Sequence, residues 1–194
     1  MAATAPPDRR WAIERSRALI EERAVFLDTE TTGLDATSEV VEICIVDHGG
    51  AVLLDSLISP TGTIPPAAIA IHGIDEGMVR GAPSWAALWP RVDSILSGHP
   101  VAVYNAEFDL RMMRQSHMAH GLRWRPGDRD LSCVMRLYAA FSGQWSGRHG
   151  AYRWHTLGAA ATQCGVAVSG THRARADALL ARAVLRHMAD QQDG

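Results

Sequence analysis

The sequence predicts an α/β fold, and two features of its pattern support that prediction. Three β-type apolar runs come early in the chain, at residues 25–27, 40–47 and 51–59. A fourth run, at 101–104, is followed by a segment of helical character over 106–120. Early strands followed by alternating strand and helix are typical of a mixed sheet covered by helices.

Length and composition favour one globular domain. The chain has 194 residues, 47% of them hydrophobic, which is enough to bury a sizeable core. Because no apolar run reaches membrane-spanning length and the N-terminus lacks the apolar core of a signal peptide, we expect a cytoplasmic protein that does not engage a membrane. The cysteines, Cys44, Cys133 and Cys164, are scattered singly, which favours reduced thiols over disulfides or a zinc site.

Two carboxylates stand two residues apart where the first β-run ends. Alternate side chains of a strand share a face, so Asp28 and Glu30 are predicted to point the same way, within reach of one ion. Two like charges that close are costly without a cation between them. Carboxylate oxygens are ligands of hard cations such as Mg²⁺, which makes a metal site the natural resolution. On the spacing alone, a solvated strand end with two surface acids is the simpler explanation.

Two further constellations supply the parts that such a site lacks. They are Tyr104-Asn105-Ala106-Glu107-Phe108-Asp109 and His172-Arg173-Ala174-Arg175-Ala176-Asp177. Together with Asp28-Thr29-Glu30, they resemble, in order and content, the three exonuclease motifs of the DnaQ-like family of 3′→5′ exonucleases. The match is to the DEDDh branch, which has a histidine five positions before the last aspartate. It covers the chain from about residue 24 to residue 188.

This resemblance implies a ribonuclease H-like fold. Three antiparallel strands followed by two parallel ones would form a five-stranded mixed sheet, flanked by helices. The resemblance also divides the chain into an N-terminal extension over residues 1–23, partly helical, and a 3′→5′ exonuclease domain over residues 24–190. Because the family core does not require the extension, it either packs on the sheet or marks a contact with a partner.

The resemblance further implies catalytic roles for five residues. Two divalent ions, Mg²⁺ or Mn²⁺, would stabilise charge on the attacking and leaving oxygens of a phosphodiester. Asp28 would bridge both ions, and Glu30 and Asp177 would complete the first ion's ligands. Asp109 would hold the second ion, directly or through water. His172, on the loop before the last helix, would accept the proton of the attacking water, a task suited to an imidazole.

The resemblance places the terminal nucleotide in a pocket closed on one side. Residues 31–34 and the His72-Gly73-Ile74 element would surround it. From the residues alone, His72 is ordinary polar loop surface, and Phe108 is predicted to face the core. The expected substrate-binding residues are Thr31, Gly33, Leu34, His72, Asn105 and Phe108.

The distribution of charge predicts a phosphate-facing surface, although the net charge of the chain is −2. Residues 131–176 contain no Asp or Glu but several arginines, which suits the upstream phosphates of a nucleic acid. Trp145 and Trp154 are candidates for stacking on bases, and core packing explains Trp154 at least as well. The arginines of this acid-free stretch are Arg136, Arg148, Arg153, Arg173 and Arg175.

The remaining segments are assigned from periodicity and from turn residues. Residues 1–7 are expected to be disordered, and His48-Gly49-Gly50 to form a hairpin turn. Pro90 should kink or break the helix that Ser84 caps, and Glu42 is assigned a structural role. Helices are predicted over 8–22, 75–79, 84–96, 130–141, 156–164 and 173–187, loops over 60–66 and 123–129, and an irregular excursion over 142–152.

The sequence therefore predicts a metal-dependent 3′→5′ exonuclease acting on single-stranded or frayed 3′ ends. A catalytically retired nucleic-acid-binding or polymerase-associated scaffold domain is the alternative, but retirement usually shows as lost carboxylates, and all of them are present. The pattern leaves open whether the substrate is DNA or RNA, and whether the enzyme proofreads with a polymerase partner, serves repair or trims RNA. No polymerase-binding tail is evident, which modestly favours a free-standing enzyme.

Overall fold

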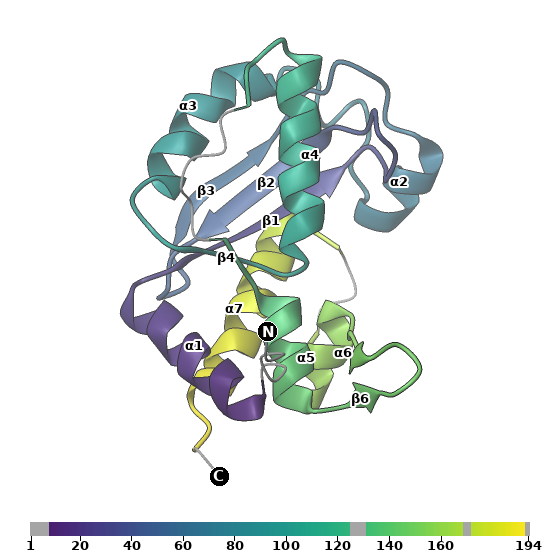
Figure 1. Ribbon diagram of the computed structural model, residues 1–194. Coiled ribbons are helices and arrows are strands. Elements are labelled where there is room, and N and C mark those ends of the chain that lie inside the picture. The colour runs from purple at the N-terminus through teal and green to yellow at the C-terminus, as the bar shows by residue number, and fades with distance from the viewer. Residues whose placement is uncertain (1–7, 125–130, 169–171, 193–194) are drawn as a thin grey trace.

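A five-stranded mixed sheet forms the centre of the molecule (Figure 1). The computed structural model describes residues 8–124, 131–168 and 172–192. The strand order is β3-β2-β1-β4-β5, in which β1, β2 and β3 pair antiparallel while β4 and β5 continue from β1 in parallel. This topology confirms the predicted α/β fold of ribonuclease H-like type. The strands are β1 (Val25–Thr31), β2 (Val40–Val46), β3 (Val52–Leu57), β4 (Val101–Val103) and β5 (Leu131–Cys133).

Helices cover both faces of the sheet and bury two separate cores. On one face, α3 (Trp85–Leu96) and α4 (Ala106–Ala119) pack against the strands. On the other face lie four helices, of which α1 brings the N-terminal extension into the core rather than leaving it apart. A short helix, α2 (Pro66–His72), closes a smaller cluster beside β2. The four helices are α1 (Arg9–Glu21), α5 (Val134–Ser142), α6 (Leu157–Gln163) and α7 (Ala174–Ala189).

The alternation along β1 determines where its polar side chains point. Leu27 lies in the core beneath α3 and α4, whereas Phe26 lies in the core beneath α1, α5 and α7. Since side chains two apart share a face, Asp28 and Glu30 continue the Phe26 face toward α7. Thr29 continues the Leu27 face toward α4. The central strand therefore presents acids to one helix and a hydroxyl to another.

The helix predicted over residues 75–79 is wrong in position. The helix lies earlier, at Pro66–His72, and residues 76–80 form turns. Pro66 occupies the first helical turn, where a missing N–H costs nothing, and Gly73 ends the helix at φ +72°. The prediction treated the His72-Gly73-Ile74 segment as a lead into a helix, although Gly73 is the typical residue that terminates one.

Residues 131–152 also differ from their prediction. Leu131–Cys133 is a strand before a helix, because it pairs with β4 at the sheet edge, with Val101 opposite Leu131. This pairing with a distant strand overrides the helical pattern. Within the predicted irregular excursion, β6 (Trp145–Ser146) and β7 (Ala151–Tyr152) form a small hairpin. Residue 130 lies outside the described residues.

Several local predictions are confirmed. Asp8 and Ser84 cap their helices through side-chain oxygens, and Gly50 at φ +95° completes the turn between β2 and β3. Of the two outcomes predicted for Pro90, a kink or a break, the break is wrong, because α3 runs through Pro90. The predictions for residues 1–7, and for residues 125–129 of the predicted loop, lie outside the described residues. Among the residues that are described, no helix combines the length and the apolar character needed to cross a membrane.

Trp85 is expected to be a major source of stability. Its side chain is fully buried, and its indole N–H donates to Nδ1 of His117 at 2.9 Å. Trp85→Ala should lower the free energy of unfolding by about 3–5 kcal/mol, measured by urea denaturation. Trp154→Ala is the control, because that side chain is 59% exposed and should change stability by no more than about 0.5 kcal/mol. Equal losses in the two variants would contradict the burial described here.

Candidate active site

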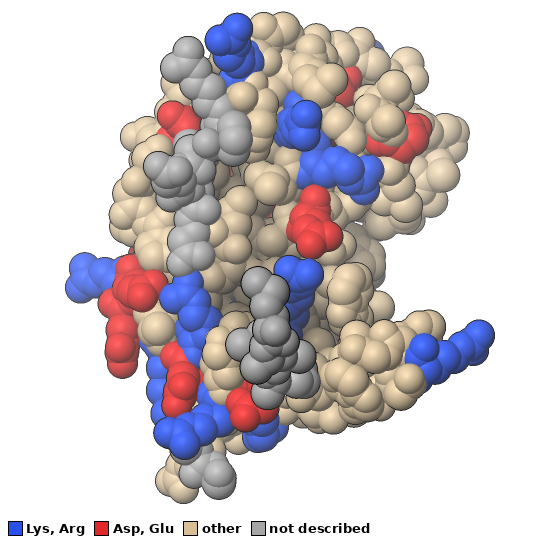
Figure 2. Space-filling view, in the orientation of Figure 1, with Lys and Arg blue, Asp and Glu red and all other residues tan. Residues whose placement is uncertain are grey.

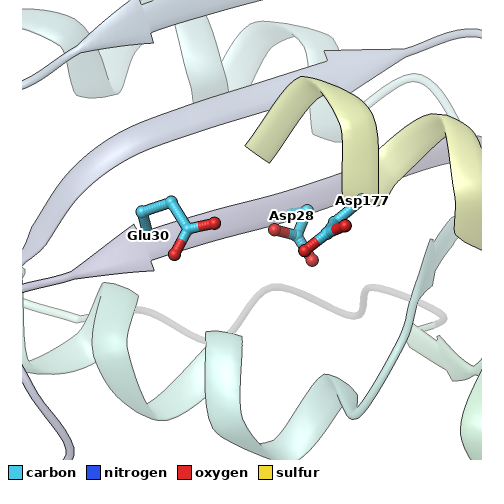
Figure 3. Close-up of side chains that lie close together, drawn as sticks. All are labelled: Asp28, Glu30 and Asp177. Carbon is cyan, nitrogen blue, oxygen red and sulfur yellow. The ribbon is translucent and has the colours of Figure 1, made fainter. Parts of the chain in front are cut away.

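Three carboxylates meet between the middle of the sheet and the start of α7 (Figure 3). Asp28 and Glu30 come from β1, and Asp177 comes from the first turn of α7. One oxygen atom from each lies within 4.8 Å of the others. The two strand residues thus share a face, as their spacing predicts, and α7 brings the third acid to it from nearly 150 residues away in the chain.

Asp109 lies next to this cluster but outside it. It sits in the first turn of α4 and is almost fully buried. Its Oδ1 accepts hydrogen bonds from the Thr29 backbone N–H at 3.1 Å and from the Thr29 hydroxyl at 2.8 Å. Thr29 therefore orients Asp109, using the face of β1 opposite to Asp28. The sequence predicts the place of Asp109 in the first helical turn, but not this contact.

His172 lies just before α7, exposed to solvent, as predicted from the expected start of that helix. Its Nδ1 is 3.3 Å from Oδ2 of Asp177. The side chain of His172 is 66% exposed and that of Asp177 19%. The imidazole is therefore attached to the edge of the acidic cluster, where it is open to a solvent molecule or a substrate.

The electrostatics of the metal-free cluster are unfavourable to its charges. Burial raises the pKa of Asp28 well above its usual value, and the charges of Asp109, Asp177 and Glu30 raise it further. Burial, followed by Asp177, raises the pKa of Glu30 to about 8. Burial also raises the pKa of Asp109 to about 7 against the opposing hydrogen bonds from Thr29. The pKa of Asp177 is raised by burial, with His172 acting in the opposite sense.

These properties fit a divalent cation. The donors of the cluster are carboxylate oxygens, which are the ligands that Mg²⁺ and Mn²⁺ prefer. A cation among them would favour the charged forms, which burial disfavours and which, for Asp28 and Glu30, the neighbouring carboxylates disfavour further. The charge of Arg173 lowers the pKa of Glu30, but the hydrogen bonds of its guanidinium go to Glu42.

Glu42 holds the start of α7 in place, and the sequence does not reveal how. Its buried carboxylate accepts hydrogen bonds from the Arg173 guanidinium, with Nε 3.0 Å from both oxygens. It also accepts the backbone N–H of Ala174 at 2.9 Å. Glu42 is the cross-strand partner of Glu30, a register that only the folded sheet shows. The structural role assigned to Glu42 is confirmed, and Arg173 of the predicted phosphate-facing surface is paired with it.

The turn after β1 carries the residues expected around a terminal nucleotide. The Thr31 hydroxyl donates to the carbonyl of Gly33 at 2.8 Å, and Leu34 is 74% exposed. Arg111 of α4 donates to the carbonyl of Leu34 at 3.0 Å. This turn is therefore fixed from α4, next to the carboxylates. Its contact with substrate stays a prediction.

The other residues expected to bind substrate differ in their surroundings. His72 is buried, with Nε2 3.2 Å from the Thr31 carbonyl and Nδ1 accepting the Ile74 N–H at 3.0 Å. Both ring nitrogens are thus engaged within the protein, and His72 supports the end of β1. Asn105 is exposed in the left-handed region at φ +63°, directly before α4. Phe108 is partly buried against the core beneath α3 and α4, as predicted.

Comparison with known proteins identifies the family. Residues 25–185 match the family model described as "Exonuclease". The chain is 38% identical over 182 residues to an uncharacterised exonuclease, CP81, of Escherichia phage 186, covering 91% of this chain and 93% of that protein. The chain belongs to the RNase T/DnaQ-like family of DEDDh exonucleases, and it is an exonuclease.

Solved structures agree with this assignment. A structure of Exonuclease X in complex with 5′ overhanging duplex DNA is 28% identical, with a TM-score of 0.61, and the match covers 85% of this chain and 90% of that one. The nuclease domain of 3′hExo, a DEDDh family member bound to rAMP, matches with a TM-score of 0.69 over 87% of this chain and 92% of that one. At 13% identity, that second match supports the fold alone.

Thermal stability should depend on pH and on metal together. Because the folded-state pKa values of these carboxyl groups lie above their unfolded values near 4, the folded protein binds the protons more tightly. That stabilisation is complete below the unfolded pKa and is lost as pH rises through about 7 to 8. The melting temperature of the metal-free protein should therefore fall between pH 5 and 8, as measured by differential scanning fluorimetry.

Excess Mg²⁺ should restore more stability at pH 8 than at pH 5, since the ion and the protons compete for the same oxygens. Asp28→Asn is the matched comparison, because it removes a charge at constant size and should flatten both dependences. A gain from Mg²⁺ that is equal at every pH would show that the ion binds elsewhere.

Proposed function

We propose that this chain is a metal-dependent 3′→5′ exonuclease that releases 5′-mononucleotides one at a time from unpaired 3′ ends of DNA or RNA. The observation that carries the proposal is the carboxylate cluster of Asp28, Glu30 and Asp177, within 4.8 Å of one another and bordered by His172. Family membership supports the nuclease chemistry, and the DNA-bound relative supports a nucleic acid as the substrate class.

The carboxylates are assigned to two divalent ions, Mg²⁺ or Mn²⁺. Asp28, Glu30 and Asp177 would hold one ion, and Asp28 with Asp109 would hold the other. When bound, such ions supply positive charge at the attacking and leaving oxygens of a phosphodiester. Each of these residues stands on a strand or on the first turn of a helix anchored in a core, so the ligands are held before substrate arrives.

His172 is assigned to the proton of the attacking water. Its contact with Asp177 through Nδ1 orients the ring and leaves Nε2 to take that proton. As the water oxygen bonds to phosphorus, the bond from phosphorus to the O3′ of the preceding nucleotide breaks. That O3′ takes up a proton and becomes the new 3′-hydroxyl. The terminal nucleotide leaves with its phosphate on the 5′ carbon.

Selectivity for an end is assigned to the turn of residues 31–34. The turn follows Glu30 directly and is fixed by His72 from one side and Arg111 from the other. We propose that this turn, beside the reacting phosphate, blocks a strand that would continue past it. Unpaired ends should be preferred, because a paired terminus must first leave its stack at a cost of roughly a few kcal/mol.

Linear and circular single strands of the same sequence provide the test. A linear strand labelled at its 5′ end should shorten to a ladder in Mg²⁺ and stay intact in chelator, while the circle should stay intact in both. Asp28→Ala should abolish the ladder and leave the circular dichroism spectrum unchanged. Digesting DNA and RNA strands of the same sequence in parallel would show whether deoxyribose or ribose is preferred. Circles cut as readily as linear strands would refute the end-selective pocket, and an active Asp28→Ala variant would refute the site.

His172→Ala should separate proton transfer from metal binding. The variant is expected to lose about 10²–10⁴-fold in rate, the range for a general acid or base. Its stabilisation by Mg²⁺ should stay close to that of the parent, because the carboxylates are unchanged. His149→Ala is the control for stability and for the stabilisation by Mg²⁺, because His149 is also an exposed histidine. If His172→Ala instead loses the Mg²⁺ stabilisation, the residue is a ligand and not a base.

A further inference from the structure

A small hairpin stands apart from the main sheet. Among the described residues, its two strands, β6 and β7, pair only with each other, and at the base of the hairpin the Arg153 N–H donates to the Gln144 carbonyl at 2.8 Å. Trp145 and Tyr152 pack edge to face across the strands, with ring centroids 5.2 Å apart. Figure 2 shows the hairpin as an arm that extends from the body, with positive charge at its outer end.

The structure divides the five arginines of the acid-free stretch into two groups. Three of them contact a carboxylate and are thereby compensated, whereas Arg148 and Arg153 are exposed on the hairpin. Neither of these two contacts a carboxylate among the described residues. The uncompensated positive charge of the stretch is therefore concentrated on the hairpin. The compensated arginines are Arg136, 3.7 Å from Glu107, Arg175, 3.9 Å from Asp55, and Arg173, bound to Glu42.

Exposed aromatic rings accompany this charge. Trp145 is 51% exposed and Trp154 is 59% exposed, so the alternative that Trp154 packs in the core is wrong. A hollow of about 670 Å³ opens beside Trp154. Flat rings next to arginines are the combination that holds unpaired nucleotides, by stacking on the bases and pairing with the phosphates. The hollow is lined by Ser146, His149, Ala151, Tyr152, Arg153 and Trp154.

The base of the hairpin is attached to the catalytic edge of the sheet. The Tyr104 hydroxyl donates to the carbonyl of His155 at 2.9 Å. Tyr104 directly follows β4, which runs parallel to β1 with Val103 beside Leu27. Continuing that register by one residue places Tyr104 beside Asp28. A nucleic acid strand whose 3′ end lies at Asp28 would therefore reach the hairpin within a few nucleotides.

We infer that residues 145–154 are the docking surface for the single-stranded segment immediately upstream of the 3′ end. Its phosphates contact Arg148 and Arg153, and a base stacks on Trp154. Charge complementarity selects a polyanion, and exposed indole faces select unpaired bases, because a duplex hides its base faces. The inference rests on the proposed function for the position of the 3′ end, and it adds where the rest of the strand lies.

Binding measured without hydrolysis tests this surface. In an Asp28→Ala background, the affinity for fluorescent single-stranded DNA should rise with length until the strand reaches the hairpin. Adding Arg148→Ser and Arg153→Ser should remove most of that rise. It should also reduce the slope of log K against log salt by about 1.4, the value for two lost phosphate contacts on a single strand. Adding Trp154→Ala alone should weaken binding of long strands roughly 5- to 150-fold, with little change in salt slope.

The matched control removes two exposed arginines that lie outside the hairpin, on α1 and α7. Arg10 on α1 and Arg186 near the end of α7 are both exposed, so Arg10→Ser with Arg186→Ser makes the same change in net charge. The inference is overturned if the hairpin and control variants have the same salt slope and length dependence. It is also overturned if Arg148 and Arg153 matter for duplex but not for single strands. If binding depends on the hairpin but the parent protein, with Asp28 intact, hydrolyses no nucleic acid strand, the proposed function alone is refuted.

Discussion

The confinement of like charges is the constraint on which this structure depends. Asp28, Glu30 and Asp177 converge in a place partly closed to water, with Asp109 beside them, and burial raises the pKa of each. Without a counter-ion, the charged forms of these carboxylates destabilise the folded state. The rest of the fold must therefore hold them together by other means, and a divalent cation is the species that would reverse the sign of the interaction.

The means are visible in the contacts around the cluster. Glu42 binds both the side chain of Arg173 and the first backbone N–H of α7, which fixes the helix that carries Asp177. Thr29 binds Asp109 from the opposite face of β1. Both anchors stand on the central strands, between the two cores. The acids are thus positioned by elements that gain their stability elsewhere in the molecule.

Much of this arrangement could be predicted from the sequence, because strand periodicity and short motifs are local signals. The spacing of Asp28 and Glu30 placed them on one face, and the turn at Gly50 and the cap at Asp8 were recognisable from residue type. The order of the three motifs indicated the family, and the family implied the sheet topology.

Apart from the helix misplaced at residues 75–79, where Gly73 is a local signal, what escaped prediction was decided by contacts between distant segments. The three residues of β5 become a strand only because β4 lies beside them, and Pro90 stays within a helix whose Trp85 is held in the core. The pairing of Glu42 with Arg173 joins residues more than 130 positions apart and compensates the charge of one arginine of the predicted phosphate surface. For the same reason, the separation of free from compensated arginines needed the folded chain.

The number of Mn²⁺ ions bound per chain tests the central claim most directly. Electron paramagnetic resonance of free Mn²⁺ during a titration counts the bound ions without reference to any substrate. The account predicts two ions in the parent protein at pH 8 and loss of both sites, or of all but weak binding, in Asp28→Asn. Binding that is unchanged in Asp28→Asn, or a parent protein that binds no Mn²⁺, would contradict it.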